Sequence, residues 1–488
     1  MVERLFIQFR HLVFNDITMF SKESKVLDMG DYQRFKFGEC VKEKSNTFVL
    51  DEGGLSSPLS ISLVIPTKFE PEGILEIEED TLQRILAQCS ELVDAGYLDE
   101  IIIMGATQDA EGKPDFGVLQ NVVRIAYEEL GLFKEQVDLL NKYRSQNEKA
   151  KRGLIDFFLK VIHQFDTNLS KLLAGYGVFG ATGNFGIPPG KGSGLWLSVP
   201  LARGDILCFV DADIIDFKKE YVTGLCHPII YSWKVQEAAI KFVKAYYSRV
   251  TITETNSQIP VLGGRICRLL AVPILKSITE IFKLYLGLES IKYPLAGEFA
   301  VSRDISEQMS FPNTFAVETS LLFQTYDLVG PLSMAQLNLD IYRHIGKLFE
   351  NLEPMAYQIV DSAFRVIDEK LGRSLTNEEK EQFILSYKEN VDKLINEYEK
   401  TASNLKKRGE NIVYSQENDL EKIQLFQKAI QDVLAGRSKE KRPRYLTLPS
   451  WRRISERTRN YFALKEMLRR RTNQSTWSRL RDCKLLHA

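Results

Sequence analysis

An apolar segment that ends in two carboxylates is the feature that most constrains the fold of this chain. The segment runs from Gly204 to Val210 and is followed at once by Asp211-Ala-Asp213. A short, continuously apolar run predicts a strand covered on both faces, as in a parallel sheet with helices on either side. Because side chains alternate along an extended chain, we expect Asp211 and Asp213 to point the same way beyond Val210.

Two more apolar runs indicate the class of the sheet. Ser62-Leu-Val-Ile-Pro66 and Glu100-Ile-Ile-Ile-Met104 predict strands, and the amphipathic stretch from Glu79 to Leu92 predicts a helix between them. Strand, helix, strand is the repeating unit of a parallel sheet, so the sequence predicts an α/β fold.

Changes in composition predict the domain organisation. Residues 59–350 are expected to form the α/β domain, after an N-terminal lead-in over residues 1–58 that ends in a Gly- and Ser-rich stretch. The predicted parts outside the sheet are a helical insertion over about 112–176, which includes a helix-forming stretch over 153–173, an all-helical extension over 351–436 and a basic C-terminal segment over 437–488.

The basic C-terminal segment stands out against a balanced chain. The formal net charge is −1, yet residues 437–488 hold 16 Lys and Arg against 4 Asp and Glu. Aromatic residues such as Trp451 and Trp477 interleave with the arginines. Two interpretations stay open, contact with RNA or anionic lipid, or packing on the acidic body of the same chain or a partner subunit. The second is favoured, so nucleic acid is not an expected partner.

The chain is predicted to be cytoplasmic and to lack a membrane span. Its six cysteines lack Cys-x-x-Cys spacing, which indicates neither a zinc site nor a disulfide framework. The N-terminus has charges inside any would-be apolar core, so it does not resemble a secretory signal. No apolar run reaches the roughly 18 residues that a membrane span requires.

Two motifs point to chemistry on a phosphate-bearing substrate. Asp211 and Asp213 supply hard oxygen ligands at a strand end, which suit Mg²⁺ or Mn²⁺, although a solvated Asp-rich turn would have the same sequence. The loop Pro188-Pro-Gly-Lys-Gly-Ser-Gly194 offers backbone N–H groups and a lysine to a phosphate. It is not a P-loop, because Phe185 and Gly192 break that pattern, and a flexible surface loop is also compatible with it.

These two motifs belong to a longer series of motifs along the chain. The series consists of Pro66 with Glu70, the Gly-Lys-Gly loop, Asp211-Ala-Asp213, Gly263-Gly-Arg-Ile-Cys-Arg268, Tyr293-Pro-Leu-Ala-Gly-Glu-Phe-Ala300, Ala316-Val-Glu-Thr-Ser-Leu321 and Asp340-Ile-Tyr-Arg-His344. Together they resemble retaining GT-A glycosyltransferases, most closely the glucosyl-3-phosphoglycerate synthases and more distantly the mannosylglycerate synthases. The resemblance covers roughly residues 60–105 and 186–350.

The resemblance implies a role for each matching position. It implies a GT-A fold in which Lys191, Asp211 and Glu318 are catalytic and Asp213 binds the divalent metal together with His344. The implied donor-binding residues are Pro66, Thr67, Glu70, Lys191, Asp211 and Leu295. The implied acceptor-binding residues are Gly264, Arg265 and Cys267.

The implied reaction is a Mg²⁺- or Mn²⁺-dependent transfer of a hexose, glucose in this family, from a UDP-, GDP- or ADP-sugar to 3-phosphoglycerate. A leaving diphosphate oxygen can take the acceptor proton, unless Glu318 acts as nucleophile in a double displacement. Cys267 and Gly346 replace the family's usual Thr and Asn, so free glycerate stays open as the acceptor. Transfer of mannose also stays open, as does a non-catalytic scaffold that binds partners through its C-terminal third. A homodimer is expected from the resemblance alone.

Overall fold

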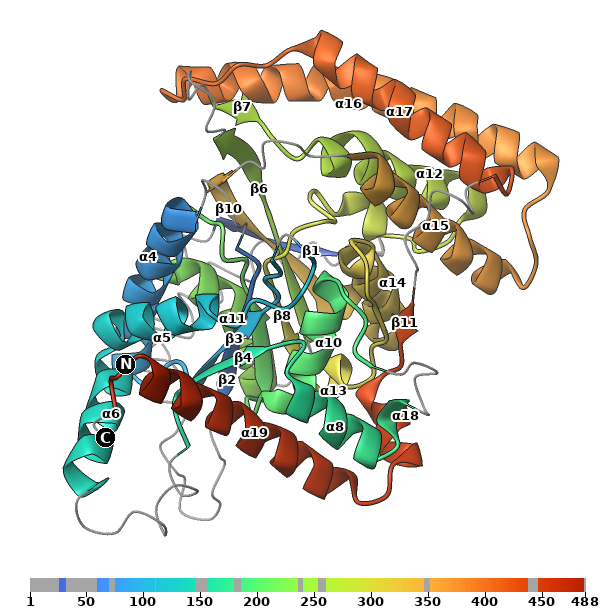
Figure 1. Ribbon diagram of the computed structural model, residues 1–488. Helices are drawn as coiled ribbons and strands as arrows, with labels where there is room; N and C mark the ends of the chain where they lie inside the picture. The colour runs from blue at the N-terminus through green and yellow to red at the C-terminus, as the bar shows by residue number, and fades with distance from the viewer. Residues whose placement is uncertain are drawn as a thin grey trace.

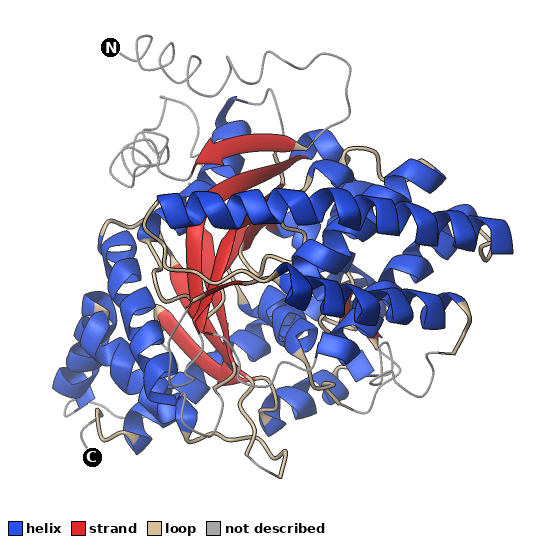
Figure 2. Cartoon of the chain, turned by 90° about the horizontal axis from the view of Figure 1, so that it is seen from above, coloured by secondary structure: helices blue, strands red, loops and turns tan. Residues whose placement is uncertain are grey.

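A nine-stranded sheet runs through the centre of the molecule, with helices packed on both faces (Figures 1 and 2). The computed structural model describes residues 26–31, 59–69, 75–109, 111–144, 156–179, 186–235, 240–252, 260–345, 352–437 and 446–486. Its strands are β1 (Leu27–Asp31), β2 (Ile61–Thr67), β3 (Glu100–Gly105), β4 (Leu159–His163), β5 (Ile206–Phe209), β6 (Phe242–Ile252), β7 (Val261–Leu262), β8 (Phe299–Ser302), β9 (Phe311–Pro312), β10 (Met334–Ile345) and β11 (Thr447–Leu448).

The α-helices connect these strands and form most of the C-terminal third. They are α4 (Leu75–Asp94), α5 (Val118–Glu129), α6 (Gly131–Arg144), α8 (Thr167–Gly175), α10 (Lys191–Leu201), α11 (Lys219–Val235), α12 (Val272–Phe282), α13 (Arg303–Ser306), α14 (Val317–Val329), α15 (Leu352–Leu371), α16 (Asn377–Lys407), α17 (Gln416–Leu434), α18 (Trp451–Arg457) and α19 (Tyr461–Asp482). In the described parts of the chain, no helix combines the length and the apolar character needed to cross a membrane.

The predicted α/β fold with a mostly parallel sheet is confirmed. The strand order is β1-β10-β6-β8-β5-β2-β3-β4, and β7 pairs with β6. Only β8 and β7 run antiparallel to their neighbours in this sheet. Successive side chains of β5 enter different cores: Leu207 packs with the core on the α10 side, whereas Cys208 packs with the core on the α4 and α11 side. Burial on both faces explains why these strands are continuously apolar.

The sheet topology brings distant motifs to one edge. Strands β2, β3, β4 and β5 are parallel to one another, and β6 and β10 run the same way because both β5 and β6 are antiparallel to β8. The carboxyl ends of all these strands therefore lie at the same edge. In open α/β sheets, this edge is where ligands bind.

The predicted helical insertion over 112–176 is wrong in one respect. It contains helices α5, α6 and α8, but residues 159–163 form strand β4, which extends the sheet beyond β3. Lys160 and His163 interrupt the apolar pattern of this strand, so the strand was not predicted from the sequence. Both are buried, and Lys160 is neutralised by an ion pair with Glu100 on β3. Tertiary pairing thus makes a strand of a segment whose own pattern favours a helix.

The boundary predicted at residue 58 also differs from the structure. Residues 27–31 of the predicted lead-in form β1, which pairs in parallel with β10 at the far edge of the sheet. The predicted helical extension is present as α15, α16 and α17, and α16 and α17 lie side by side along one end of the molecule (Figure 1).

The basic C-terminal segment packs on the body of its own chain. Helix α19 runs across β4, α5, α8 and α10 (Figure 1). Arg471 pairs with Asp166 at 2.7 Å, Lys465 pairs with Glu307 at 2.7 Å, and Arg469 donates to the Ala202 carbonyl at 2.7 Å. The favoured interpretation of this segment, a basic helix packed on an acidic surface, is confirmed for these residues.

Candidate active site

A large pocket opens at the carboxyl edge of the sheet, with a volume of about 1140 Å³. Every predicted site residue that lies within the described chain lines it: Pro66, Thr67, Lys191, Asp211, Asp213, Gly264, Arg265, Cys267, Leu295, Glu318 and His344. Glu70 falls outside the described residues, as does Gly346. The pocket is therefore one place where motifs separated by up to 278 positions in the sequence come together.

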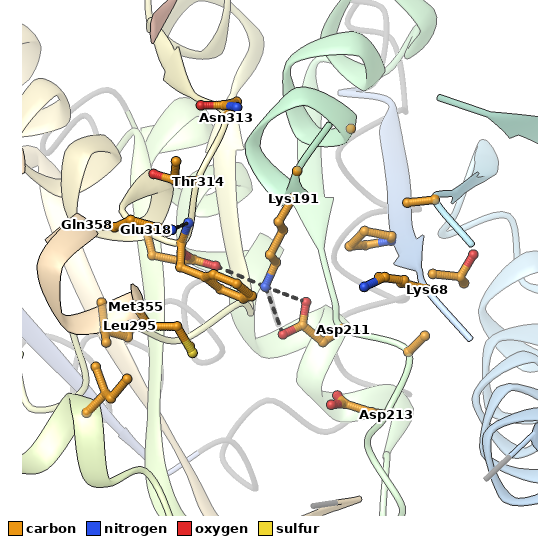
Figure 3. Close-up of a pocket in the computed structure, with 18 of the residues that line it drawn as sticks. Lys68, Lys191, Asp211, Asp213, Leu295, Asn313, Thr314, Glu318, Met355 and Gln358 are labelled. Atoms are coloured by element: carbon orange, nitrogen blue, oxygen red, sulfur yellow. Dashed lines mark hydrogen bonds and ion pairs between the residues drawn. The ribbon is translucent and has the colours of Figure 1, made fainter. Parts of the chain in front are cut away.

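Lys191 holds two carboxylates together at the centre of the pocket. Its Nζ lies 2.9 Å from Asp211 Oδ1 and 2.9 Å from Glu318 Oε1, and it also donates to Asp211 Oδ2 at 3.1 Å (Figure 3). Burial by itself would lower the pKa of Lys191, but Asp211 and Glu318 outweigh burial and raise this pKa above its ordinary value. The side chain therefore stays an ammonium cation throughout the physiological pH range.

The glycines that flank Lys191 allow two backbones to touch. Gly190 has φ of +129°, and a Cβ there would lie 1.8 Å from the Asn313 carbonyl oxygen. A Cβ on Gly192 would lie 1.7 Å from the Pro312 carbonyl oxygen. These contacts seat the start of α10 against β9, so the lysine is the first residue of a helix whose N-terminus faces the pocket. A helix N-terminus favours anions, which suits a diphosphate at this position.

The predicted metal pair, Asp213 and His344, meets because the end of β10 pairs with the loop that follows β5. Ile214 forms a β-bridge with His344, and the Ile345 N–H donates to the Asp213 carbonyl at 3.3 Å. His344 Nδ1 consequently lies 3.9 Å from Asp213 Oδ2. This proximity across 131 positions was implied by the resemblance and has no signal in local spacing.

The chemistry of Asp213 and His344 fits a divalent cation. A carboxylate and a neutral imidazole are ligands that Mn²⁺ and Mg²⁺ accept, with the remaining positions left to substrate oxygens and water. Within the described residues, no group of three or more His, Cys, Asp or Glu side chains is arranged to hold a metal, so this site offers two protein ligands. Burial, with a smaller contribution from Arg249, lowers the pKa of His344 well below its ordinary value, which keeps the ring neutral.

The predicted acceptor residues form a tight turn against an aromatic ring. Gly264 has φ of +70°, and a Cβ there would lie 2.3 Å from the hydroxyl oxygen of Tyr293. Arg265 lines the pocket directly after this turn. Burial raises the pKa of the Cys267 thiol to about 12, so Cys267 stays uncharged and does not repel an anion.

The part of the pocket around Thr67 contains buried polar atoms that lack partners among the described residues. Thr67 Oγ1 and Gln164 Oε1 are buried and have no hydrogen-bond partner among the described residues, and both residues line the pocket. Buried polar atoms are nearly always satisfied, so an unpaired pair beside a cavity indicates that a ligand completes them. Thr67 was predicted from the resemblance, whereas Gln164 was missed because it follows the unrecognised strand β4.

The C-terminal third supplies part of the pocket wall, which the sequence did not indicate. Met355 and Gln358 of α15 line the pocket, and Figure 3 shows both with Leu295, across the pocket from Lys68. Leu446, next to β11, also lines it. Its backbone N–H donates to Asn313 Oδ1 at 2.9 Å, and the Asn313 amide donates to the Pro189 carbonyl at 3.0 Å. The predicted helical extension and the basic C-terminal segment therefore both contribute to the pocket wall.

Two buried charged residues, Glu298 and Lys244, lie close to the central ion pairs of the pocket. Glu298 is fully buried and accepts hydrogen bonds from Tyr342 at 2.6 Å and from Tyr247 at 2.9 Å. Burial, reinforced by the nearby charge of Asp211, raises the pKa of Glu298 to about 7. Lys244 is also fully buried, and burial lowers its pKa to about 8. Burial thus moves the pKa of Glu298 up and that of Lys244 down, each toward neutral pH.

We expect Glu298→Gln to change the pH dependence of stability. In the wild type, the folded protein retains the Glu298 proton up to about pH 7, whereas the unfolded chain loses it near its ordinary pKa of 4.5. The wild-type free energy of unfolding must then fall as pH rises between these values, by up to about 3 kcal/mol from this group. Urea unfolding of both proteins at pH 5 and pH 8 measures it, and identical pH dependence in the two would contradict the assignment.

Comparisons with known proteins agree with the resemblance seen in the sequence. No family model matches the chain. A glucosyl-3-phosphoglycerate synthase from Mycobacterium tuberculosis is 31% identical over 176 residues, which cover 36% of this chain and 51% of that enzyme. One from Petrotoga mobilis is 30% identical over 213 residues, which cover 43% of this chain and 61% of that enzyme. The match thus spans about half the length of these curated relatives.

Solved structures with the same description were also found. The glucosyl-3-phosphoglycerate synthase of Mycobacterium tuberculosis in complex with Mn²⁺, UDP and phosphoglyceric acid is 22% identical, with a TM-score of 0.46, over 72% of this chain and 88% of that one. The same enzyme with Mg²⁺ and UDP gives a TM-score of 0.45. The sequence matches confirm the predicted resemblance: over the part of the chain that they cover, it is similar to glucosyl-3-phosphoglycerate synthases.

Proposed function

We propose that this protein is a metal-dependent retaining glycosyltransferase that moves glucose from a nucleotide sugar to 3-phosphoglycerate. The observation that carries the proposal is the convergence of Lys191, Asp211, Asp213, Glu318 and His344 in one pocket, in the order of the matching motifs. The names of the curated relatives supply the substrate class. A GT-A assignment agrees with the mostly parallel sheet and with the site at its carboxyl edge.

In this proposal, the chain's residues bind and orient two anionic substrates. Asp213 and His344 would hold Mg²⁺ or Mn²⁺, which when bound neutralises the charge that develops on the leaving diphosphate. Lys191 places a permanent positive charge between Asp211 and Glu318, at the N-terminus of α10. Thr67 and Gln164 present unpaired polar atoms to the donor. A guanidinium at Arg265 suits the carboxylate or phosphate of the acceptor.

The position of Glu318 favours a binding role over a nucleophilic one. Its carboxylate is buried and ion-paired with Lys191 at 2.9 Å, and a carboxylate neutralised in this way is a weak nucleophile. We therefore propose that Glu318 fixes Lys191 and contacts the transferred sugar. A diphosphate oxygen of the leaving group then takes the proton of the acceptor hydroxyl.

The test is a transfer assay with the full-length protein. Purified protein is incubated with Mg²⁺ or Mn²⁺, with UDP-, GDP- or ADP-glucose or GDP-mannose, and with either 3-phosphoglycerate or glycerate. Glucosyl-3-phosphoglycerate formed only with a metal present is the expected product. Glucosylglycerate or a mannosylated product would replace the proposed acceptor or sugar, and no transfer from any donor would contradict the proposal in favour of a scaffold.

Arg265→Ala is expected to weaken acceptor binding selectively. Loss of charge-assisted hydrogen bonds to an anion should raise the KM for 3-phosphoglycerate by about 10- to 100-fold. The KM for the nucleotide sugar should change by less than about twofold, because the donor contacts lie with Thr67 and Lys191. Steady-state kinetics with each substrate varied in turn measures both values. An equal rise in the two constants would reject the acceptor role of Arg265.

A homodimer forms part of the same proposal, because the resemblance implies one. Light scattering during size-exclusion chromatography tests this, with a mass of twice 55.9 kDa expected. A monomer would remove the dimer from the proposal without affecting the transfer reaction.

A further inference from the structure

Arg249 contacts both His344, of the candidate metal pair, and Gly263, at the start of the predicted acceptor turn (Gly263 to Arg265). It lies near the end of β6 and lines the pocket. On one side its Nη2 lies 3.0 Å from His344 Nδ1. On the other, its backbone carbonyl accepts from the Gly263 N–H at 2.8 Å, and a Cβ on Gly263 would lie 3.2 Å from Arg249 Cγ. No sequence motif assigns this residue a role.

The hydrogen bond from Arg249 occupies the metal-binding atom of His344. A guanidinium only donates, so Nδ1 must be the acceptor, and Nε2 carries the proton that it donates to Thr251 Oγ1 at 2.8 Å. Nδ1 is also the ring nitrogen that lies 3.9 Å from Asp213 Oδ2. The single lone pair of Nδ1 can either accept a hydrogen bond or coordinate a metal ion, but cannot do both at once. Arg249 and a divalent cation therefore exclude each other at His344.

Arg249 is incompletely satisfied where it lies. Its Nε is buried and has no hydrogen-bond partner among the described residues. An unmade hydrogen bond at a buried charged group costs free energy. The guanidinium should therefore leave this position when an anion that can accept its hydrogen bonds binds nearby. The neighbouring acceptor turn, Gly263 to Arg265, lines the same pocket and is within reach of the Arg249 side chain.

We propose that Arg249 is a positioning residue that couples the metal to the acceptor. Without metal, its guanidinium occupies His344 Nδ1 and lowers the affinity of the site for a divalent cation. When metal binds Asp213 and His344, the guanidinium is released toward the acceptor turn, where it joins Arg265 on an anionic acceptor. The identity of that anion rests on the proposed function, whereas the competition at His344 does not.

The competition is tested by Mn²⁺ binding to the full-length protein without nucleotide, followed by the EPR signal of free Mn²⁺. Arg249→Met removes the charge and keeps the length of the side chain. We expect it to tighten Mn²⁺ binding about tenfold, the effect of about 1.4 kcal/mol of relieved competition. Arg265→Met is the matched control, because it removes the same charge from the same pocket without freeing Nδ1. We expect less than about a threefold change in this control.

The coupling is tested by repeating the titration with saturating 3-phosphoglycerate or inorganic phosphate. In the wild type, the anion should draw Arg249 away and tighten Mn²⁺ binding by about fivefold or more. In Arg249→Met, the anion should leave Mn²⁺ affinity unchanged. The Mn²⁺ affinity of Arg249→Lys should lie between those of the wild type and Arg249→Met. This variant replaces Arg249→Met in the experiment if the methionine variant fails to fold.

Three results would overturn the inference. One is an Mn²⁺ affinity in Arg249→Met that is equal to or weaker than that of Arg265→Met. Another is a gain that persists when His344→Ala is added, because the gain would then not come from Nδ1. A third is an anion effect of the same size in the wild type and in Arg249→Met. Because these readouts need no turnover, tight Mn²⁺ binding without glucosyl transfer would reject the proposed function and leave the competition intact.

Discussion

Asp213→Ala is expected to abolish metal-dependent transfer while the protein stays folded. Asp213 supplies the carboxylate of the candidate metal pair, and its loss leaves His344 as the single protein ligand. Losing the charge stabilisation that a bound metal gives a leaving diphosphate should lower kcat/KM on the order of a thousandfold, or about 4 kcal/mol. Steady-state kinetics at saturating Mg²⁺ measures the activity, and a melting curve checks the fold.

Asp216→Asn is the control for this variant. Asp216 lies three positions further along the same loop and accepts hydrogen bonds from the backbone and side chain of Arg343, at 2.9 and 2.8 Å, and it does not line the pocket. Asparagine keeps an acceptor for Arg343 and removes one negative charge. Activity within about threefold of the wild type is expected. Turnover retained in Asp213→Ala, or lost equally in both variants, would remove Asp213 from the metal site.

Lys191→Met is expected to damage both activity and stability. The ammonium separates the carboxylates of Asp211 and Glu318, each 2.9 Å away, so its loss leaves two negative charges facing each other in a partly buried pocket. Breaking a buried ion pair typically costs about 3–5 kcal/mol, and partial exposure of Lys191 and Asp211 reduces this to about 2 kcal/mol. Loss of a cation at the leaving diphosphate should lower kcat at least about 100-fold.

A surface ion pair provides the comparison for Lys191→Met. Lys241, just before β6, pairs with Asp304 at 3.2 Å on the exposed surface. Lys241→Met removes the same functional group and should change the free energy of unfolding by no more than about 0.5 kcal/mol, with activity preserved. If urea unfolding finds the two variants equally stable, the central ion-pair network is not a structural element of the site.

The continuously apolar strands were the most predictable part of the fold. The predicted strands over 62–66, 100–104 and 204–210 correspond to β2, β3 and β5, and the predicted helix over 79–92 lies within α4. Each is an element whose own side-chain pattern agrees with its final environment. Strand β4 was missed because its polar residues, Lys160 and His163, are stabilised by partners elsewhere in the chain. Local pattern fails where burial depends on a distant partner.

The residues of the candidate site also differ in whether the local sequence could predict them. The pairing of Asp211 with Asp213 follows from two residues in one short segment, and both line the pocket. The role of His344 came from the resemblance, because no spacing rule relates it to Asp213. Arg249, Gln164, Met355 and Leu446 had no sequence signal at all. They reach the pocket through strand order and through the packing of the C-terminal third.

The class of the fold, the position of the carboxylate pair at a strand end and the order of motifs that underlies the resemblance could all be read from the amino-acid sequence. These depend on short-range periodicity and on residues close together in the chain. The shared pocket, the contact of Lys191 with two carboxylates and the contact of Arg249 with His344 Nδ1 became visible only in the folded chain. This is because parallel strands bring their carboxyl ends to one edge of the sheet, whatever their separation in sequence.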